Sequence, residues 1–174
     1  LKKGFHNSKS SVSYEDFLQI IKDKGKKYIP GGSPANVIRG AARFSVKTAL
    51  FGTIGTDAYG YEYLKNIRKF GIKSLISLAL GKSGVCYTLI TEDKEKTSVT
   101  SMGVSAVFNF NLKKLREADI FHTSGYEVIS NPEKTIESID YAKNFAKISF
   151  DLADPCTVRK ERKNIEEIIK KTDI

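Results

Sequence analysis

Segments of strand and helix character alternate along the chain, and this alternation restricts the fold more than any other feature of the sequence. Apolar strand candidates occupy residues 46–51, 72–80, 119–123 and 148–152, and helix candidates occupy 35–44, 61–70, 132–147 and 158–171. Parallel strands need a crossover connection, which is usually a helix. This order therefore predicts an α/β fold built on a parallel sheet.

One antiparallel element interrupts the alternation. Residues 85–91 and 97–102 are rich in β-branched residues, and the turn between them, at 92–96, is wholly charged. This pattern is typical of a β-hairpin. We predict a small antiparallel hairpin attached to the α/β sheet.

Length and composition limit the class of protein. The 174 residues suit one domain. The composition is 40% hydrophobic and 28% charged, which argues against a disordered or collagen-like chain. No apolar run approaches the roughly 20 residues of a membrane helix, and residues 1–6 lack the apolar part of a signal peptide. We therefore expect a globular protein with no membrane partner.

Cysteine usage and charge give weaker indications. The two cysteines, Cys86 and Cys156, have no metal-like spacing to each other or to the two histidines, His6 and His122. This usage favours a reducing compartment, and we predict a cytoplasmic location. The net charge is +9, but the lysines are scattered and mixed with acidic residues, so we do not expect a nucleic-acid partner.

The most distinctive motif is Gly-Gly-Ser-Pro-Ala-Asn at residues 31–36. Ser33, which precedes a proline, is typical of a helix N-cap. Gly31 and Gly32 would let a ligand approach the free N–H groups of that helix. Asn36 could donate to and accept from adjacent hydroxyls of a sugar. An ordinary turn before a helix explains the same residues, so the motif alone leaves both interpretations open.

A second glycine-rich stretch, at residues 52–60, has the pattern Gly-x-x-Gly-x-Asp-x-x-Gly. It lacks the Lys-Ser/Thr pair of a P-loop, and its glycine spacing is not that of a dinucleotide fingerprint. We therefore predict a tight connection from a strand to a helix, with Asp57 as the helix cap.

Two further polar stretches follow predicted strands, where the carboxyl ends of a parallel sheet face the ligand crevice. Asp151 and Asp154 could bind hydroxyls or a metal-bound nucleotide, or could cap the next helix. Tyr126, in the run Ser-Gly-Tyr at 124–126, could stack on a flat ligand or simply pack. His122 is more typical of a core or surface histidine than of a catalytic base.

Taken together, these motifs resemble the PfkB family of carbohydrate and nucleoside kinases. The likeness extends in the family's order over nearly the whole chain, and it rests on residues 31–36, Ser45, Gly55, 52–60, the lid-like hairpin at 83–97, 124–126 and 150–155. The last two segments are similar to stretches of the adenosine-kinase-like branch. The chain departs from the family at Ile38, where a small residue is preferred, and at Lys96, where an arginine is usual.

The resemblance implies a ribokinase-like fold, with three layers around a parallel sheet and a small antiparallel lid. Residues 1–174 would form one partial domain, with lid segments near 1–12 and 83–102. The family's first strand, its Asn-x-x-Glu motif and its Gly-Ala-Gly-Asp motif have no counterpart in this sequence. We expect the general base to lie beyond Ile174, and Thr172–Ile174 to begin another buried strand.

The resemblance also implies a function: phosphoryl transfer from ATP, with Mg²⁺, to a primary hydroxyl of a sugar or nucleoside. Gly31, Gly32 and Asn36 would bind the acceptor, and Cys86, Tyr126 and Asp151 are possible substrate or lid contacts. No metal ligand is assigned within the chain, and this part alone is expected to be inactive. Two copies could pair through the lid. The alternative is a catalytically inactive sugar- or nucleoside-binding protein of the same fold.

Overall fold

The computed structural model describes residues 18–19, 21–22, 27–90, 92–107 and 111–174. The predicted lid segment near residues 1–12 lies outside the described residues. Among the described helices, none is long and apolar enough to cross a membrane.

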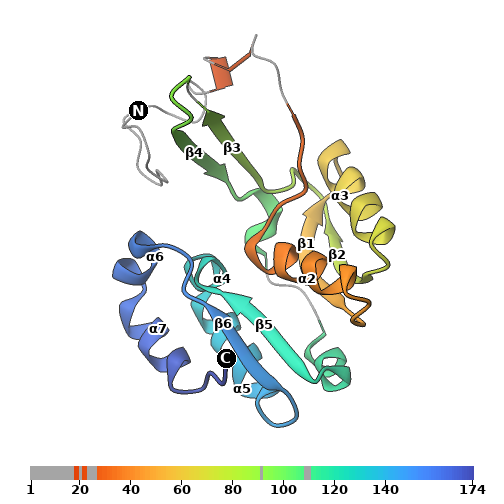
Figure 1. Cartoon of the computed structure of the whole chain (residues 1–174), viewed down its shortest axis with the longest axis vertical. Helices are drawn as coiled ribbons and strands as arrows, with labels where there is room; N and C mark the ends of the chain where they lie inside the picture. The colour runs from red at the N-terminus through yellow and green to blue at the C-terminus, as the bar shows by residue number, and fades with distance from the viewer. Residues whose placement is uncertain (1–17, 20, 23–26, 91, 108–110) are drawn as a thin grey trace.

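The first part of the molecule contains a parallel pair of strands with two helices (Figure 1). Its elements follow the order α2 (Ser33–Arg43), β1 (Ala49–Gly55), α3 (Ala58–Lys69) and β2 (Lys73–Ala79). Strands β1 and β2 pair in parallel over their whole length, from Ala49 opposite Lys73 to Gly55 opposite Ala79. We call this part the N-terminal lobe.

The chain then forms the predicted hairpin, which lies at one end of the molecule in Figure 1. Strands β3 (Val85–Ile90) and β4 (Lys96–Ser101) are antiparallel, with Val85 opposite Ser101. A 3₁₀ turn, η1 (Gly103–Ala106), follows and contacts β1. We call the hairpin the lid, because the family resemblance assigns it that role.

The remaining chain forms a second α/β unit, the C-terminal lobe. Its elements are η2 (Leu112–Glu117), β5 (Ile120–Ser124), α4 (Gly125–Ser130), α5 (Pro132–Ala142), β6 (Lys147–Asp151), α6 (Pro155–Lys160) and α7 (Arg162–Ile169). Strands β5 and β6 are parallel, with Ser124 opposite Asp151. The predicted helix over 158–171 is wrong as a single element, because α6 ends at Lys160 and α7 begins at Arg162, with Glu161 between them.

The α/β class with parallel strands and an antiparallel hairpin is confirmed, although the parallel strands form two separate pairs in the described part of the chain. Strands β1 and β5 do not pair with each other, and residues from both strands line one cavity. At the chain's end, Asp173 N–H donates to Ile148 O at 2.8 Å, and Phe150 N–H donates to Ile174 O at 3.1 Å. Thr172–Ile174 therefore runs beside β6 as a parallel strand would, but the predicted burial is wrong, because Ile174 is 64% exposed.

The prediction that the first strand ends at residue 51 is wrong. Strand β1 continues to Gly55, so that residues 52–55 of the predicted glycine loop are strand. Gly52 pairs with Ile76, and Ile54 is 7% exposed. Pairing with β2 and burial outweigh the weak strand propensity of glycine.

Each lobe has its own cluster of buried apolar side chains. In the C-terminal lobe, Ile139, Ile148 and Ile168 are fully buried where α5, β6 and α7 meet. In the N-terminal lobe, Ile67 of α3 is fully buried against Leu50 of β1 and its neighbours. Burying each such side chain contributes about 1.5–3 kcal/mol. The apolar spacing predicted for the helix at 132–147 is confirmed at Ile139 and Ala142.

Asp57 joins three elements through one carboxylate. Its Oδ1 accepts hydrogen bonds from Gly60 N–H, at 2.9 Å, and from Ser83 Oγ, at 2.6 Å. Its Oδ2 accepts from Ser83 N–H at 2.9 Å, and Ser83 Oγ accepts from Gly55 N–H at 2.9 Å. The end of β1, the start of α3 and the base of the lid are therefore fixed to one another. The predicted helix-capping role of Asp57 is confirmed.

The backbone is closely packed around this carboxylate. A Cβ atom on Gly60 would lie 2.1 Å from the carbonyl oxygen of Gly55. A Cβ atom on Gly55 would lie 2.2 Å from the carbonyl oxygen of Gly81. Side chains at these positions would separate the base of the lid from β1.

We expect Asp57→Ala to lower the free energy of unfolding by about 2 kcal/mol, because it removes the helix cap and leaves buried Ser83 without its acceptor. Urea unfolding followed by circular dichroism measures this change. Asp140→Ala is the matched control: Asp140 is exposed, and its partner Lys171 keeps a second ion pair with Glu167, so the loss should cost less than about 1 kcal/mol. Equal effects of the two variants would contradict the role of Asp57.

We expect Gly60→Ala to destabilise the protein, although alanine ordinarily stabilises a helix interior by about 1 kcal/mol relative to glycine. The new methyl group would overlap the Gly55 carbonyl. Gly40→Ala in α2 is the control, because its Cβ would meet nothing within 4 Å. Thermal unfolding should show a lower Tm for the first variant and an unchanged or higher Tm for the second.

Candidate functional site

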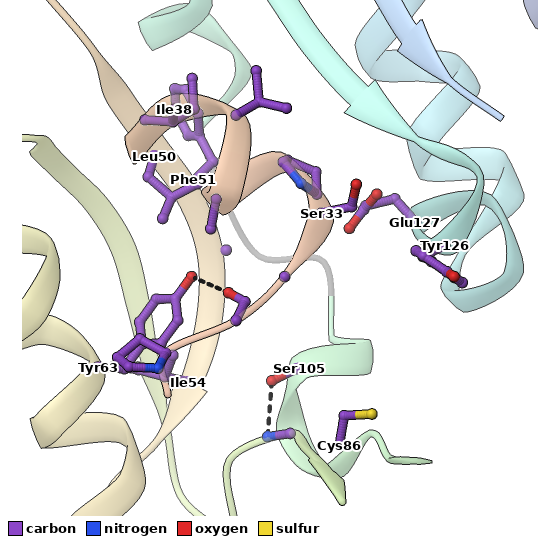
Figure 2. A pocket seen from close by; sticks show the side chains of 18 of the residues that line it. Ser33, Ile38, Leu50, Phe51, Ile54, Tyr63, Cys86, Ser105, Tyr126 and Glu127 are labelled. Atoms are coloured by element: carbon purple, nitrogen blue, oxygen red, sulfur yellow. Dashed lines mark hydrogen bonds between the residues drawn. The ribbon is translucent and has the colours of Figure 1, made fainter. Parts of the chain in front are cut away.

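An open cavity of about 3230 Å³ lies between the two lobes and the lid. It is lined by β1 and β5, by the segment that leads into α2, and by lid residues (Figure 2). A pocket for one small ligand usually measures about 300–1,000 Å³. A single small molecule would therefore occupy only part of this space. The polar groups at the edge of the cavity indicate where it would bind.

The loop before α2 forms one wall of the cavity. Gly31 and Gly32 both line it, and Gly32 has a φ of +98°, which favours glycine. The hydroxyl of Tyr63 donates to the carbonyl of Gly31 at 3.2 Å, as Figure 2 shows. Asn36 N–H donates to Gly32 O at 2.9 Å and begins the helical hydrogen bonding. Exposed backbone at the start of a helix can bind electronegative ligand atoms.

The predicted N-cap at Ser33 is wrong. Gly32 occupies the cap position without any side-chain cap, and Ser33 is the first residue of α2. The Ser33 hydroxyl donates instead to Asp151 Oδ2 at 2.7 Å, across 118 positions of sequence. The Ser33 hydroxyl therefore bonds to a residue distant in sequence and not to the N–H groups of its own helix.

Asn36 does not line the cavity, although it is exposed on the first turn of α2. Its Oδ1 accepts from the guanidinium of Arg39. Arg39 also donates to Asn66 Oδ1 at 3.3 Å. The structure therefore places Asn36 next to the glycine loop, with its amide directed at Arg39.

Tyr126 lies on the opposite wall, on the first turn of α4, and faces the cavity (Figure 2). Its hydroxyl hydrogen-bonds to Asp154. Burial, together with the nearby Asp154 carboxylate, raises the pKa of Tyr126 to about 12. The phenol is therefore neutral at physiological pH, and its ring is held at the edge of the cavity.

Asp154 caps a helix, which was one of the two roles left open by the sequence. Its Oδ1 accepts from Cys156 N–H at 2.7 Å and from Thr157 N–H at 3.0 Å. Burial opposes ionisation of this carboxyl, but hydrogen bonds from Thr157 and Cys156 outweigh it and lower the pKa of Asp154.

Asp151 is not among the cavity-lining residues. Its Oδ2 accepts from Ser33, and its Oδ1 accepts from Ala153 N–H at 2.9 Å. The hydrogen bond from Ser33, followed by that from Ala153, lowers the pKa of Asp151. The carboxylate is thus ionised and bound on both oxygens.

Cys86 lines the cavity from the lid strand β3, and its thiol is free and exposed. The structure thus brings Gly31, Gly32, Cys86 and Tyr126 to one cavity. Asn36 and Asp151 are not among the residues that line it.

Two residues not assigned to the site from sequence also lie here. Glu127 lines the cavity, and its Oε2 accepts from Ser124 Oγ at 2.6 Å; burial raises the pKa of Glu127. The spacing Ser-x-x-Glu of a capping box could have indicated it. His122 hydrogen-bonds through Nδ1 to Ser149 Oγ at 2.9 Å, whereas its buried Nε2 has no partner. No local signal identifies that contact, because strand pairing creates it.

The described residues contain no group of three or more His, Cys, Asp or Glu side chains that could hold a metal ion. The carboxylates of Asp151 and Asp154 already accept hydrogen bonds from their neighbours.

Comparison with known proteins identifies the family. The family model for pfkB family carbohydrate kinases matches residues 10–174. The chain belongs to this family. It is 27% identical over 177 residues to a probable fructokinase-2 of Arabidopsis thaliana, an alignment that covers 94% of this chain and 54% of that protein. The chain thus spans about half the length of the curated relatives it matches.

Solved structures share the ribokinase-like fold of this pfkB family chain. The adenosine kinase of Sinorhizobium meliloti superimposes with a TM-score of 0.85 at 19% identity, covering 99% of this chain and 55% of that one. The fructokinase of Xylella fastidiosa gives a TM-score of 0.74 at 20% identity, covering 86% and 54%. At these identities the likeness shows the fold alone.

Replacing Ser33 with alanine should raise the pKa of Asp151 toward its ordinary value, because the strongest hydrogen bond to the carboxylate is lost. A carboxyl with a lowered folded pKa stabilises the fold above its unfolded pKa of about 3.9, and this contribution is lost as the pH falls through the folded pKa. The variant should therefore be less stable than wild type at neutral pH. The difference should shrink on acidification, as the Asp151 carboxyl becomes protonated in the wild type and in the variant. Carboxyl NMR titration and urea unfolding at several pH values measure both effects, and an unchanged Asp151 pKa would contradict the assignment.

Proposed function

We propose that the protein containing this chain transfers a phosphoryl group from ATP to a primary hydroxyl of a sugar or nucleoside, and that this chain supplies the acceptor site and the lid. One observation carries the proposal: the glycine loop, Tyr126 and the lid residue Cys86 line the same cavity. Membership of a carbohydrate kinase family gives the reaction class.

The glycine loop suits the hydroxyl groups of an acceptor. Gly31 and Gly32 are exposed and have no Cβ atoms, so a hydroxyl can approach the backbone closely. The first N–H groups of α2 have no helical partner and can donate to it. We propose that Asn36 binds a second hydroxyl of the acceptor. Its side-chain amide would give up the hydrogen bond from Arg39 and form one with the ligand instead.

The lid suits the exclusion of water from the reaction. Its base is fixed by Asp57 and Ser83, whereas β3 and β4 pair only with each other in the described chain. Closure over the acceptor would limit transfer of the phosphoryl group to water. Cys86 would then approach the acceptor from the lid side.

Either acceptor class is compatible with the surroundings of Tyr126. Its ring, fixed by Asp154, could stack on a nucleobase or cover the apolar face of a sugar. The Arabidopsis relative is named a fructokinase and the Sinorhizobium structure an adenosine kinase. We therefore propose D-fructose and adenosine as the first acceptors to test.

The proposal places the general base and the Mg²⁺–ATP site outside residues 1–174, in keeping with the family resemblance. When bound, Mg²⁺–ATP would supply the phosphoryl group and neutralise its charge. The chain's own residues would bind and orient the acceptor hydroxyl and shield it from water.

Asn36→Ala is expected to raise the KM for the acceptor about tenfold in the protein containing this chain, with little change in the KM for ATP, because one hydrogen bond to a hydroxyl is lost. Coupled ADP release with a panel of sugars and nucleosides measures both constants. Asn144→Ala is the matched control, since Asn144 hydrogen-bonds only within its own helix end. An unchanged acceptor KM would contradict the role of Asn36.

The same assay separates the kinase from the inactive binding protein. A kinase releases ADP only when a suitable acceptor is present. An inactive binding protein would give heat on calorimetric titration with fructose or adenosine, but no ADP with any acceptor. That second result would overturn the proposed reaction while supporting the acceptor site.

A further inference from the structure

Asp151 is the meeting point of two irregular features of this structure, although it does not line the cavity. One is a serine that begins a helix without capping it, and the other is an alanine with a left-handed backbone. Each feature directs a hydrogen bond to the same carboxylate. Such local departures from sequence preference concentrate at functional sites.

The first feature is the hydroxyl of Ser33. A serine at a helix start ordinarily accepts a hydrogen bond from the second or third helical N–H group. Here α2 has no side-chain cap, and Ser33 Oγ donates to Asp151 Oδ2 at 2.7 Å. The helix therefore forgoes a stabilising local contact, and the hydroxyl joins α2 to β6.

The second feature is the turn after β6. Ala153 has a φ of +71°, a conformation that is unfavourable for a residue with a Cβ atom. This conformation brings its N–H group within 2.9 Å of Asp151 Oδ1. With Ser33 on the other oxygen, the carboxylate is held from two directions and cannot turn without breaking a hydrogen bond.

The surroundings favour an ionised carboxylate at this position. The hydrogen bonds from the Ser33 hydroxyl and from Ala153 N–H lower the pKa of Asp151 and outweigh its partial burial. Glu127 is the nearby acidic group, and burial keeps the pKa of that carboxyl raised. A charged acceptor makes the bond from Ser33 stronger than a bond between neutral groups.

This bond also crosses between the lobes. Ser33 belongs to the N-terminal lobe and follows Gly31 and Gly32 directly, whereas Asp151 ends β6 of the C-terminal lobe. Another contact between the lobes, Lys73 Nζ to Glu117 Oε2 at 2.6 Å, is exposed on both side chains. An exposed ion pair contributes little rigidity, so the half-buried Ser33–Asp151 bond is the better placed of the two to fix the loop.

We propose that Asp151 is a positioning residue of the acceptor site. Through Ser33 it holds the Gly31–Gly32 backbone in place relative to β6 and to the Tyr126 wall of the cavity. This inference rests on the proposed function for its meaning in catalysis, but its structural part can be measured without any ligand.

Amide hydrogen exchange of the chain tests the structural part. Ser33→Ala and Asp151→Ala should each speed exchange of the Asn36 amide at least tenfold, since that amide donates to Gly32 O at the start of α2. The double variant should exchange no faster than the faster single variant, because both changes remove one bond. Ser33→Thr keeps a hydroxyl and should restore slow exchange.

Ser138→Ala is the matched control, because its hydroxyl donates to Lys134 O at 2.6 Å within α5. It should leave the Asn36 amide at the wild-type rate. The positioning role is overturned if Ser33→Ala leaves Asn36 exchange unchanged, or if the amides of α5 accelerate by the same factor, which would indicate a general loss of stability.

Titration with D-fructose and with adenosine then tests the connection to the acceptor. If the wild-type chain binds either compound, Ser33→Ala and Asp151→Ala should raise its Kd about tenfold, and Ser33→Thr should bind as wild type does. Unchanged binding in both variants overturns the positioning role. If the wild-type chain binds neither compound, D-fructose and adenosine are contradicted as its acceptors, and the exchange rates still decide whether Asp151 fixes the loop.

Discussion

The carboxylate of Asp57 is the contact on which the arrangement of this molecule most depends. It caps α3, accepts two hydrogen bonds from Ser83 and, through the Ser83 hydroxyl, is connected to the end of β1. The lid begins two residues later, at Val85. The direction in which the hairpin leaves the sheet is therefore fixed by one side chain, and with it the position of Cys86 over the cavity.

The polar side chains around the cavity are mostly engaged in holding the structure together. Asp154 caps α6, Glu127 completes the capping box of α4, and Asp151 binds Ser33. The exposed backbone of Gly31 and Gly32 also lines the cavity. A backbone site of this kind is rigid because helix geometry defines it, and it discriminates ligands by shape and hydroxyl position.

Much of the local structure could be predicted from the sequence. The hairpin, the cap at Asp57 and the inward positions Ile139 and Ala142 follow from short-range rules on turns, caps and apolar spacing, and the structure confirms them. The prediction failed where a distant partner competes with a local one. The strand at 46–51 shifted to Ala49–Gly55 because it pairs with β2.

The sequence alone determined the fold class, the family resemblance and the glycine loop, because these depend on residue types at fixed spacings along the chain. Only the tertiary structure decided what the polar side chains do. It turned Ser33 from its own helix to Asp151 and brought Tyr126 and Cys86 to one cavity. The physical reason is that hydrogen bonds and side-chain packing join residues more than a hundred positions apart, and no periodicity along the chain records such partners.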